Sequence, residues 1–303
     1  MKKEVKKVCL LKGGNSFERE VSFLSANVCS KTLSNLGYDV REFDFTGDVL
    51  ALINHLQAER PDCVFNALHG GSGENGNMQS LLNFFRIPYT HSGVTASSVA
   101  MHKYISCNLF EHFGIAVTKN KMESWQYFVK HQPFRYPFII KPVDSGSSDN
   151  VYLINSVDDL STVEWQRDTV LVSEYIPGLE LTVGVLDGVA LEVTNIVTKS
   201  GFFDYSNKYS EGKTFHELPA KIPDFVRKKA MDYALKAHTL LGCRGISRTD
   251  FRYNDVTQEL FVLELNSQPG LTLLSLLPEQ ASFIGIPFGQ LLQRMLELAT
   301  VDE

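Results

Sequence analysis

The sequence lacks the features of a membrane or secreted protein. No apolar run in its 303 residues approaches the roughly 18 residues that a membrane-spanning helix needs. The basic start MKKEVKKVCLLKGG has too short an apolar core for a secretory signal. The five cysteines are odd in number, scattered and free of C-x-x-C pairs, which argues against disulfides and zinc. These absences predict a protein of a reducing compartment, the cytoplasm, with no membrane partner.

Long stretches of positive charge are also missing. No block of Lys or Arg stands out, and the formal net charge is −6. A protein whose main partner is nucleic acid usually carries a basic surface, so no nucleic acid partner is expected. Hydrophobic residues make up 44% of the chain and charged residues 21%. This is an ordinary globular composition, and the length suggests about two domains.

Strands and helices alternate in the first third of the chain. Residues 6–45 read as strand, glycine turn, helix, glycine stop and strand, with Leu24, Val28 and Leu36 at helical spacing and Gly37 as the stop. A second buried strand, PDCVFNALHG, precedes a glycine loop and another helix. This alternation predicts an α/β domain with a mostly parallel sheet, whose site lies in the loops after the strands.

From about residue 97 the strands look antiparallel instead. Residues 198–217 form a polar, aromatic and glycine-containing segment that is long for a connection. Long ordered loops are often lids, so this segment is a candidate lid. Lys208, beside Tyr209, could close on a phosphate from such a lid. A solvated loop lysine is the commoner case when the residue is considered alone.

A strand near the C-terminus, FVLELNSQPG, carries two oxygen-bearing side chains. Glu264 and Asn266 share one parity and are expected to project from one face, whereas Phe261, Leu263 and Leu265 share the other, apolar parity. Two such side chains can be solvated on the wet face of an antiparallel strand, or they can hold a hard cation. This stretch alone leaves both readings open.

Two more constellations point to a nucleotide with its metal ion. Asp250, on the strand before, could add a third oxygen ligand for Mg²⁺, and Arg248 lies on the same strand face. A structural Arg–Asp pair is the more common explanation of that spacing. Lys141 ends the apolar strand of IIKPVDSGSSDNV, and small residues follow whose backbone N–H groups can surround phosphates. Gly-Ser turns between strands are common, so this signal is weak alone.

Taken together and in order, these stretches resemble the D-alanine–D-alanine ligases, a family of the ATP-grasp superfamily. The resemblance runs nearly end to end and is carried by GGNSFEREVS, ALHGGSGENG, IPYTHSGVTASSVAMHK, IIKPVDSGSS, FFDYSNKYSEGKT, GCRGISRTDF and LELNSQPGLTLLSLLP. It implies an N-terminal Rossmann-like α/β domain, followed by an ATP-grasp fold of two α+β subdomains that clamp ATP. The implied boundaries are 1–96, 97–182 and 183–303, with the lid at about 198–217.

The resemblance also implies a reaction and a nucleotide site. ATP would phosphorylate the carboxylate of one D-alanine, and the amine of a second D-alanine would attack the acyl phosphate. Lys103, Lys141 and Lys208 would neutralise the ATP phosphates, and the main-chain amides of Ser147 and Ser148 would cover them.

The same family pattern implies metal and ribose ligands. Asp250, Glu264 and Asn266 would hold two Mg²⁺ ions, with Mn²⁺ as an alternative, that bridge the phosphates. Glu180 would accept hydrogen bonds from the ribose hydroxyls.

The amino-acid substrates would lie next to the phosphates. Glu18 would bind the ammonium group of the first D-alanine, Ser147 and Tyr209 would link Glu18 to the lid, and His69 would lie near the substrates. Related ligases that make D-alanine–D-lactate carry Phe at the position of Tyr209, so the tyrosine favours an amine nucleophile.

The remaining implied residues act on the reacting carbonyl and the second substrate. Arg248 and the backbone N–H of Gly270 would stabilise the tetrahedral oxyanion. Ser275 and the amide of Leu276 would hold the second carboxylate.

Several residues depart from the family pattern. Ser173 stands where a glutamate usually recognises the adenine amino group, and the neighbouring Glu174 is a candidate substitute. Asp149–Asn150 replaces small or apolar residues near the phosphates, and His91 and His102 stand where Gly and Asp are usual. These departures bear on nucleotide affinity, because none of them removes a residue assigned to the chemistry.

Competing interpretations are a ligase with another acceptor and a catalytically silent nucleotide-binding module. The retained residues for both substrates argue against the first. The full set of lysines and metal ligands argues against the second. The family also implies a homodimer.

Overall fold

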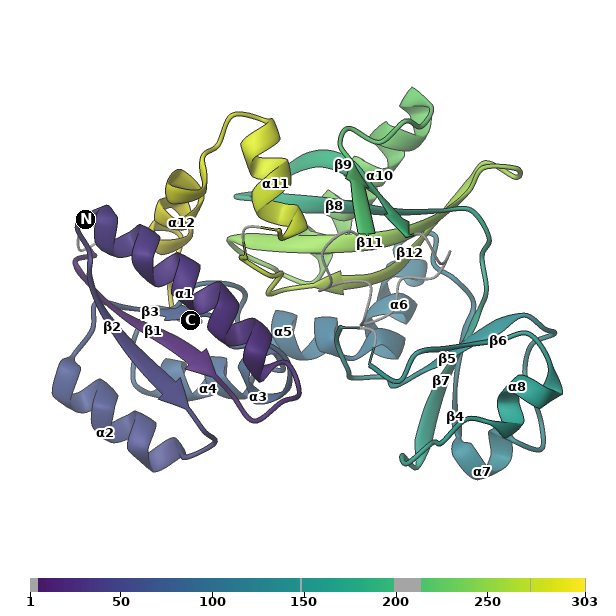
Figure 1. Cartoon of the computed structure of the whole chain (residues 1–303), viewed down its shortest axis with the longest axis horizontal. Coiled ribbons are helices and arrows are strands. Elements are labelled where there is room, and N and C mark those ends of the chain that lie inside the picture. Colours follow the sequence, from purple (N-terminus) through teal and green to yellow (C-terminus); the bar gives the residue numbers. More distant parts are fainter. Residues whose placement is uncertain (1–4, 148, 199–213, 273, 303) are drawn as a thin grey trace.

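The computed structural model describes residues 5–147, 149–198, 214–272 and 274–302, arranged around three sheets. Figure 1 shows the N-terminal sheet at one end of the molecule and the other two sheets at the opposite end. In this view the four-stranded sheet lies below the five-stranded sheet. The site predicted from the sequence falls mainly between these two sheets.

The N-terminal sheet is parallel, with the strand order β2-β1-β3. Its strands are β1 (Lys7–Gly13), β2 (Asp39–Phe45) and β3 (Cys63–Asn66). One face packs against α1 (Arg19–Asn35) and α12 (Phe288–Glu297), and the other packs against α2 (Val49–Glu59) and α4 (Asn77–Phe84). Because both faces are covered, the four consecutive residues 8–11 of β1 are all buried. This confirms the predicted α/β architecture of the N-terminal part.

The buried face of α1 differs from the one expected. Leu24 and Leu36 are 55% and 42% exposed, although they fall at helical spacing. The face that meets the sheet consists mainly of small or medium side chains, namely Val21, Ser22, Ser25, Ala26, Cys29 and Leu33. Small side chains let the helix lie close to the sheet, which hydrophobic spacing alone does not reveal. Gly37, with φ +91°, follows the helix end as predicted.

The four-stranded sheet is antiparallel, in the order β4-β7-β5-β6. Its elements, in chain order, are β4 (Asn120–Ser124), α7 (Trp125–Phe128), β5 (Phe138–Lys141), β6 (Tyr152–Ile154), α8 (Val157–Ser161) and β7 (Thr169–Glu174). One face is covered by α7 and α8 over a small core around Phe128 and Phe138. The other face is therefore available to a ligand.

The five-stranded sheet is also antiparallel, in the order β10-β9-β8-β11-β12. Its strands are β8 (Leu179–Leu186), β9 (Val189–Thr198), β10 (Thr214–Glu217), β11 (Ile246–Asn254) and β12 (Glu259–Asn266). The helix α10 (Asp224–Leu240) covers one face, and α11 (Leu276–Phe283) packs on β8 and β9. The predicted mixture of antiparallel sheets and helices is thus confirmed.

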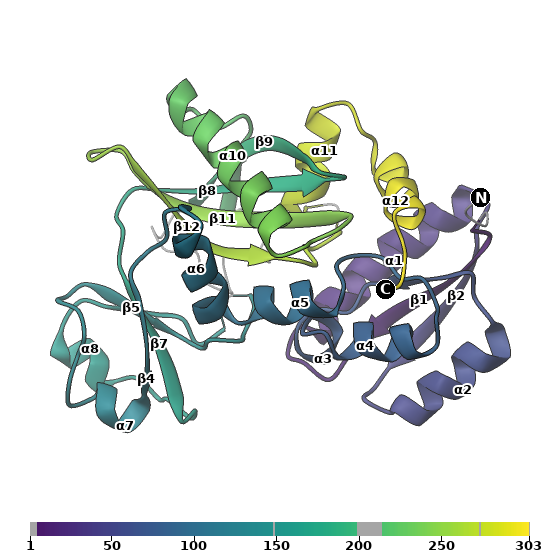
Figure 2. The ribbon, with the colours of Figure 1, turned by 180° about the vertical axis from the view of Figure 1, so that it is seen from behind.

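The remaining helices of the described residues lie between β3 and β4 in the sequence. They are α3 (Gly71–Glu74), α5 (Val94–Met101) and α6 (Lys103–His112). Both α5 and α6 pack on β12, and Figure 2 shows α5 between the N-terminal part and α6. Lys103 therefore begins a helix that is anchored to the strand carrying Glu264.

The predicted segment boundaries cut through two of these elements. The boundary after residue 96 falls within α5, and the boundary after residue 182 falls within β8, which pairs along its length with β11. In addition, α12 packs against α1, at the opposite end of the sequence. The division into three segments stays a prediction. The observed sheets and helix contacts do not follow the predicted boundaries at residues 96 and 182.

A β-bulge in β12 changes which of its residues face the core. Asp250 pairs with Glu264, but the next residue of β11 pairs with Val262, so Leu263 is the extra residue. Leu260, Val262 and Leu265 are consequently the buried residues of β12. The prediction that Leu263 shares a buried face with Leu265 was wrong. The prediction that Glu264 and Asn266 share a face is confirmed.

Candidate active site

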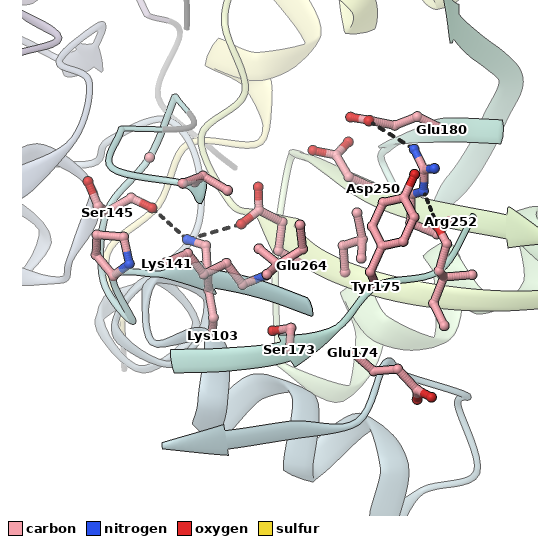
Figure 3. Close-up of a pocket in the computed structure, with 16 residues that line it drawn as sticks. Lys103, Lys141, Ser145, Ser173, Glu174, Tyr175, Glu180, Asp250, Arg252 and Glu264 are labelled. Carbon is pink, nitrogen blue, oxygen red and sulfur yellow. Dashed lines mark hydrogen bonds and ion pairs between the residues drawn. The ribbon is translucent and has the colours of Figure 1, made fainter. Parts of the chain in front are cut away.

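A pocket lies where the open face of the four-stranded sheet meets the five-stranded sheet (Figure 3). The residues that line it come from α6, β5, β7, β8, β11, β12 and the loops after β5 and β7. They are Lys103, Ile139, Lys141, Pro142, Ser145, Gly146, Val151, Ser173, Glu174, Tyr175, Ile176, Glu180, Asp250, Arg252, Leu263 and Glu264. Six of the site residues predicted from the sequence are in this set, namely Lys103, Lys141, Glu174, Glu180, Asp250 and Glu264.

Two lysines meet on one side of the pocket. Lys103, the first residue of α6, donates from Nζ to the carbonyl of Ser145 at 2.6 Å and forms an ion pair with Glu264 at 3.0 Å. Lys141, the last residue of β5, is buried, and this burial lowers its pKa although the Glu264 carboxylate opposes the effect. An anionic ligand next to Lys141 would favour the charged ammonium again. Buried lysine side chains of this kind are suited to binding phosphate groups.

The carboxylates face each other across neighbouring strands. Asp250 and Glu264 are directly paired, and Arg248 pairs with Asn266 in the same register. Asp250 accepts hydrogen bonds from Arg248 Nε and Nη2 at 2.8 and 2.7 Å, from Asn266 Nδ2 at 3.1 Å and from Thr182 Oγ1 at 2.6 Å. Three polar side chains thus converge on one buried carboxylate.

The donor set of this cluster fits Mg²⁺. Asp250 and Glu264 offer carboxylate oxygens and Asn266 an amide oxygen, and Mg²⁺ typically takes one or two carboxylates together with substrate phosphates. Within the described ranges, no group of three His, Cys, Asp or Glu side chains is arranged to hold a metal ion.

A buried carboxylate lies at the junction with the N-terminal domain. Glu18 precedes α1 and accepts a hydrogen bond from the Ser147 hydroxyl, which comes from the loop after β5. Gly146 lies against Glu18, since a Cβ there would be 2.9 Å from Oε2. The predicted pairing of Glu18 with Ser147 thus agrees with the geometry.

Gly70 shapes the other side of Glu18. Its φ is +65°, and a Cβ would lie 2.3 Å from Glu18 Oε2. We expect Gly70→Ala to raise the KM for the first amino-acid substrate at least several-fold and to cost about 1–3 kcal/mol of stability. Gly242→Ala is the matched control, because Gly242 has φ +69° with no atom near its Cβ. KM and the melting temperature of both variants check this, and equal KM values in the two variants would contradict it.

His69 is held next to this junction by two side chains. Its Nε2 lies 3.0 Å from Ser25 Oγ and its Nδ1 lies 3.2 Å from Glu74 Oε1. Ser25 is buried on the inner face of α1. These contacts hold the imidazole of His69 between α1 and α3.

The segment after β12 forms a small polar turn. Ser275 Oγ accepts from the Thr272 amide at 2.9 Å and lies 2.8 Å from Thr272 Oγ1. A Cβ on Gly270 would lie 3.0 Å from Ser275 Oγ. Leu276 begins α11, whose N-terminal amides favour a carboxylate. This arrangement is compatible with the roles predicted for Gly270, Ser275 and Leu276.

Some predicted residues are not described, and the Glu174 side chain points away from the lysines of the pocket (Figure 3). Ser148, Lys208 and Tyr209 lie outside the described residues, as does most of the predicted lid, whose last residues 214–217 form β10. The Glu174 carboxylate lies 3.9 Å from Lys119, and Figure 3 shows it pointing away from the labelled lysines. Glu174 nevertheless lines the pocket, and its role as a ligand for the adenine stays a prediction.

Arg252 is a pocket residue that the sequence analysis missed. It forms an ion pair with Glu180 at 3.5 Å and donates to the carbonyls of Ile176 and Gly178 at 3.0 and 2.9 Å. A signal was present, because Arg248, Asp250 and Arg252 alternate along β11. Arg252 ties the start of β8 to β11 and so positions Glu180.

No helix of the described chain is long and apolar enough to cross a lipid bilayer.

Comparisons with known proteins agree with this geometry. A family model described as D-ala D-ala ligase C-terminus matches residues 104–297. A D-alanine–D-alanine ligase of Acidiphilium cryptum is 44% identical over 300 residues, covering 97% of this chain and 99% of that protein. The crystal structure of a Bacillus anthracis D-alanine–D-alanine ligase complexed with ATP is 28% identical with a TM-score of 0.82, covering 98% and 97%. The VanG D-Ala:D-Ser ligase of Enterococcus faecalis is 26% identical with a TM-score of 0.80, covering 97% and 99%.

Proposed function

The chain belongs to the D-alanine–D-alanine ligase family, and from this premise we propose that it joins two D-alanine molecules at the expense of ATP. The γ-phosphoryl group of ATP passes to a carboxylate oxygen of the first D-alanine, giving D-alanyl phosphate and ADP. The amine nitrogen of the second D-alanine attacks the acyl carbon, phosphate leaves and the nitrogen loses a proton. The product, D-alanyl-D-alanine, is a precursor of peptidoglycan.

One observation carries this proposal. Arg248, Asp250, Glu264 and Asn266 lie on one face of β11 and β12, and Glu264 reaches Lys103. Phosphoryl transfer needs little covalent chemistry from the protein, and depends on positioning and on neutralising negative charge. Cations and metal-binding oxygens at adjacent positions meet both needs.

The nucleotide half of the site follows from the lysines and carboxylates. Lys103 and Lys141 would bind the phosphates, and Glu180, positioned by Arg252, would accept from the ribose hydroxyls. Asp250, Glu264 and Asn266 would hold Mg²⁺, which when bound neutralises charge on the phosphates. Mn²⁺ has the same preference for oxygen ligands and remains an alternative.

The proposed binding site for the two amino-acid substrates lies next to the nucleotide site. Glu18, held by Ser147, would bind the ammonium of the first D-alanine. Arg248 and the Gly270 amide would stabilise the oxyanion, and Ser275 with the Leu276 amide would bind the second carboxylate. Tyr209 and Lys208 of the lid, together with the Ser148 amide, belong to this proposal on the family resemblance alone.

The location and assembly are proposed on similar grounds. The reaction consumes ATP, which fits the cytoplasm, and the family resemblance favours a homodimer.

The test is ATP-dependent phosphate release with Mg²⁺. The substrates to compare are D-alanine, L-alanine, D-alanine with D-lactate, D-alanine with D-serine, and no amino acid. We expect release only when D-alanine is present, with one dipeptide found by mass for each phosphate. Phosphate release that does not depend on D-alanine would overturn the proposal.

A second candidate is a mixed ligase that prefers another acceptor. The similarity to a D-Ala:D-Ser ligase favours including D-serine among the acceptors. A mixed product in excess of the D-alanine dipeptide, at equal acceptor concentrations, would support this candidate instead.

A further inference from the structure

Gln280 is a fully buried polar residue in the middle of α11. Its Oε1 accepts a hydrogen bond from the amide of Gly184 at 2.7 Å. Its Nε2 donates to the carbonyl of Thr182 and to Thr194 Oγ1, each at 3.0 Å. The amide of Gly184 can only donate and the carbonyl of Thr182 can only accept, so the orientation of the side-chain amide is fixed. Gln280 therefore joins α11 to both β8 and β9.

The strand position beneath Gln280 is irregular. The pairing of β8 with β9 shifts its register between Val183 and Val185, which places Gly184 at a bulge. A Cβ on Gly184 would lie 2.7 Å from Gln280 Oε1 and 3.2 Å from Leu277 Cδ1. Figure 1 shows α11 beside this sheet. The absence of a side chain at residue 184 thus lets α11 approach the strand closely enough for Gln280 to bind its backbone.

Hydrogen bonds fix the place of α11 more closely than its apolar contacts do. The helix also buries apolar side chains in the core, but such contacts are non-directional and would tolerate a small shift of the helix. Hydrogen bonds are directional, and Gln280 makes three of them. The same strand carries Thr182, whose hydroxyl donates to Asp250 at 2.6 Å. Gln280 therefore sets the place of α11 relative to Asp250.

We propose that Gln280 is a positioning residue for the second D-alanine. It holds the start of α11, where Ser275 and the Leu276 amide would bind the acceptor carboxylate, at a fixed place relative to Arg248. A small displacement there weakens binding of the acceptor and misaligns its amine. The inference rests on the proposed function, because that function places the second D-alanine at the start of α11. The described residues that line the nucleotide pocket all lie between 103 and 264, outside α11, so nucleotide binding should not depend on Gln280.

The Gln280→Met variant tests this role, because it keeps the size of the side chain and removes its three hydrogen bonds. Two D-alanine molecules bind at different sites, so the dependence of the rate on D-alanine yields one constant for each site. We expect the constant of the acceptor to rise about 10- to 100-fold and the other constant to stay within about threefold. The dissociation constant of ADP, measured by calorimetry, and kcat at saturation should also stay within about threefold.

Gly184→Ala tests the same contact from the strand. Its methyl group would displace Gln280 Oε1, so the constant of the acceptor should rise in the same way. In a Gln280→Ala background the methyl group has room, and adding Gly184→Ala should then change this constant by less than about twofold.

Gln79→Met is the matched control. Gln79 is a buried glutamine of α4 that donates to the carbonyl of Gly73 at 2.9 Å. The control should lower the melting temperature, as Gln280→Met does, but leave the constant of the acceptor at its wild-type value. If Gln280 were merely structural, the melting temperature would fall in Gln280→Met without a selective change in this constant.

Binding of D-alanyl-D-alanine in the presence of ADP, followed by calorimetry, gives a readout that needs no turnover. The carboxylate of the dipeptide would bind at the start of α11, so Gln280→Met should weaken this binding about 10-fold. A wild type that binds the dipeptide but releases no phosphate with D-alanine would overturn the proposed function, and weaker dipeptide binding by Gln280→Met would still support the positioning role.

Three outcomes would overturn the inference. They are an unchanged constant of the acceptor in Gln280→Met, equal changes in both D-alanine constants and in the dissociation constant of ADP, and a wild type that does not bind the dipeptide. Should Gln280→Met fail to fold, the same criteria apply to Gly184→Ala.

Discussion

The Glu264→Gln variant is expected to lose at least about 10²–10³-fold in kcat while keeping its fold. Glu264 pairs with Lys103 at 3.0 Å and faces Asp250 across the strands. The amide has nearly the same shape but no charge, so the cluster loses a carboxylate ligand for Mg²⁺. Binding of Mn²⁺ in the presence of ADP, followed by electron paramagnetic resonance, should weaken in parallel with kcat.

A control on the same strand separates this effect from a general loss of charge. Glu259→Gln makes the same change at the exposed first residue of β12. Its kcat and Mn²⁺ affinity should match those of the wild type. If Glu264→Gln turned over at a near-normal rate with its purity verified, the assignment of Glu264 to the metal site would be wrong.

The placement of neighbouring site residues on the same strand was predictable from the sequence. Side chains two residues apart on a strand share a face, which placed Glu264 with Asn266 and Arg248 with Asp250. Family resemblance then supplied the partners from distant segments. The structure brings Glu18 to Ser147, which are 129 residues apart, and Lys103 to Glu264. The alternation of side chains along a strand carries no information on contacts between residues that are so far apart in the sequence.

Other features depended on packing that no local pattern records. The bulge at Leu263 reverses parity within β12 and brings an apolar residue into the pocket beside Glu264. The inner face of α1 was missed because Ser25 and Ala26, not Leu24, meet the sheet. The contact of Ser173 with Asn120 joins β7 to β4 through their register. Each feature is set by neighbouring strands or helices, and so it becomes visible only in three dimensions.

The Arg248→Lys variant should lose at least about 10²-fold in kcat although it keeps a positive charge. Arg248 binds Asp250 through two parallel hydrogen bonds, from Nε and Nη2. A lysine cannot reproduce this planar pair, and its ammonium would also reach the developing oxyanion from a different position. Arg248→Ala should abolish turnover, and it should also destabilise the fold because Asp250 is buried.

The lysine variant is therefore the more informative of the two, since it leaves a cation beside Asp250. Its melting temperature should stay close to that of the wild type, so that a loss of kcat reports on geometry. Arg167→Lys is the matched control, because Arg167 also pairs with an aspartate, Asp144 at 2.9 Å, but on the exposed surface. Exposed pairs contribute little, so this control should keep full activity. A normal kcat in Arg248→Lys would mean that only charge is needed at this position, and the oxyanion role of the guanidinium would have to be abandoned.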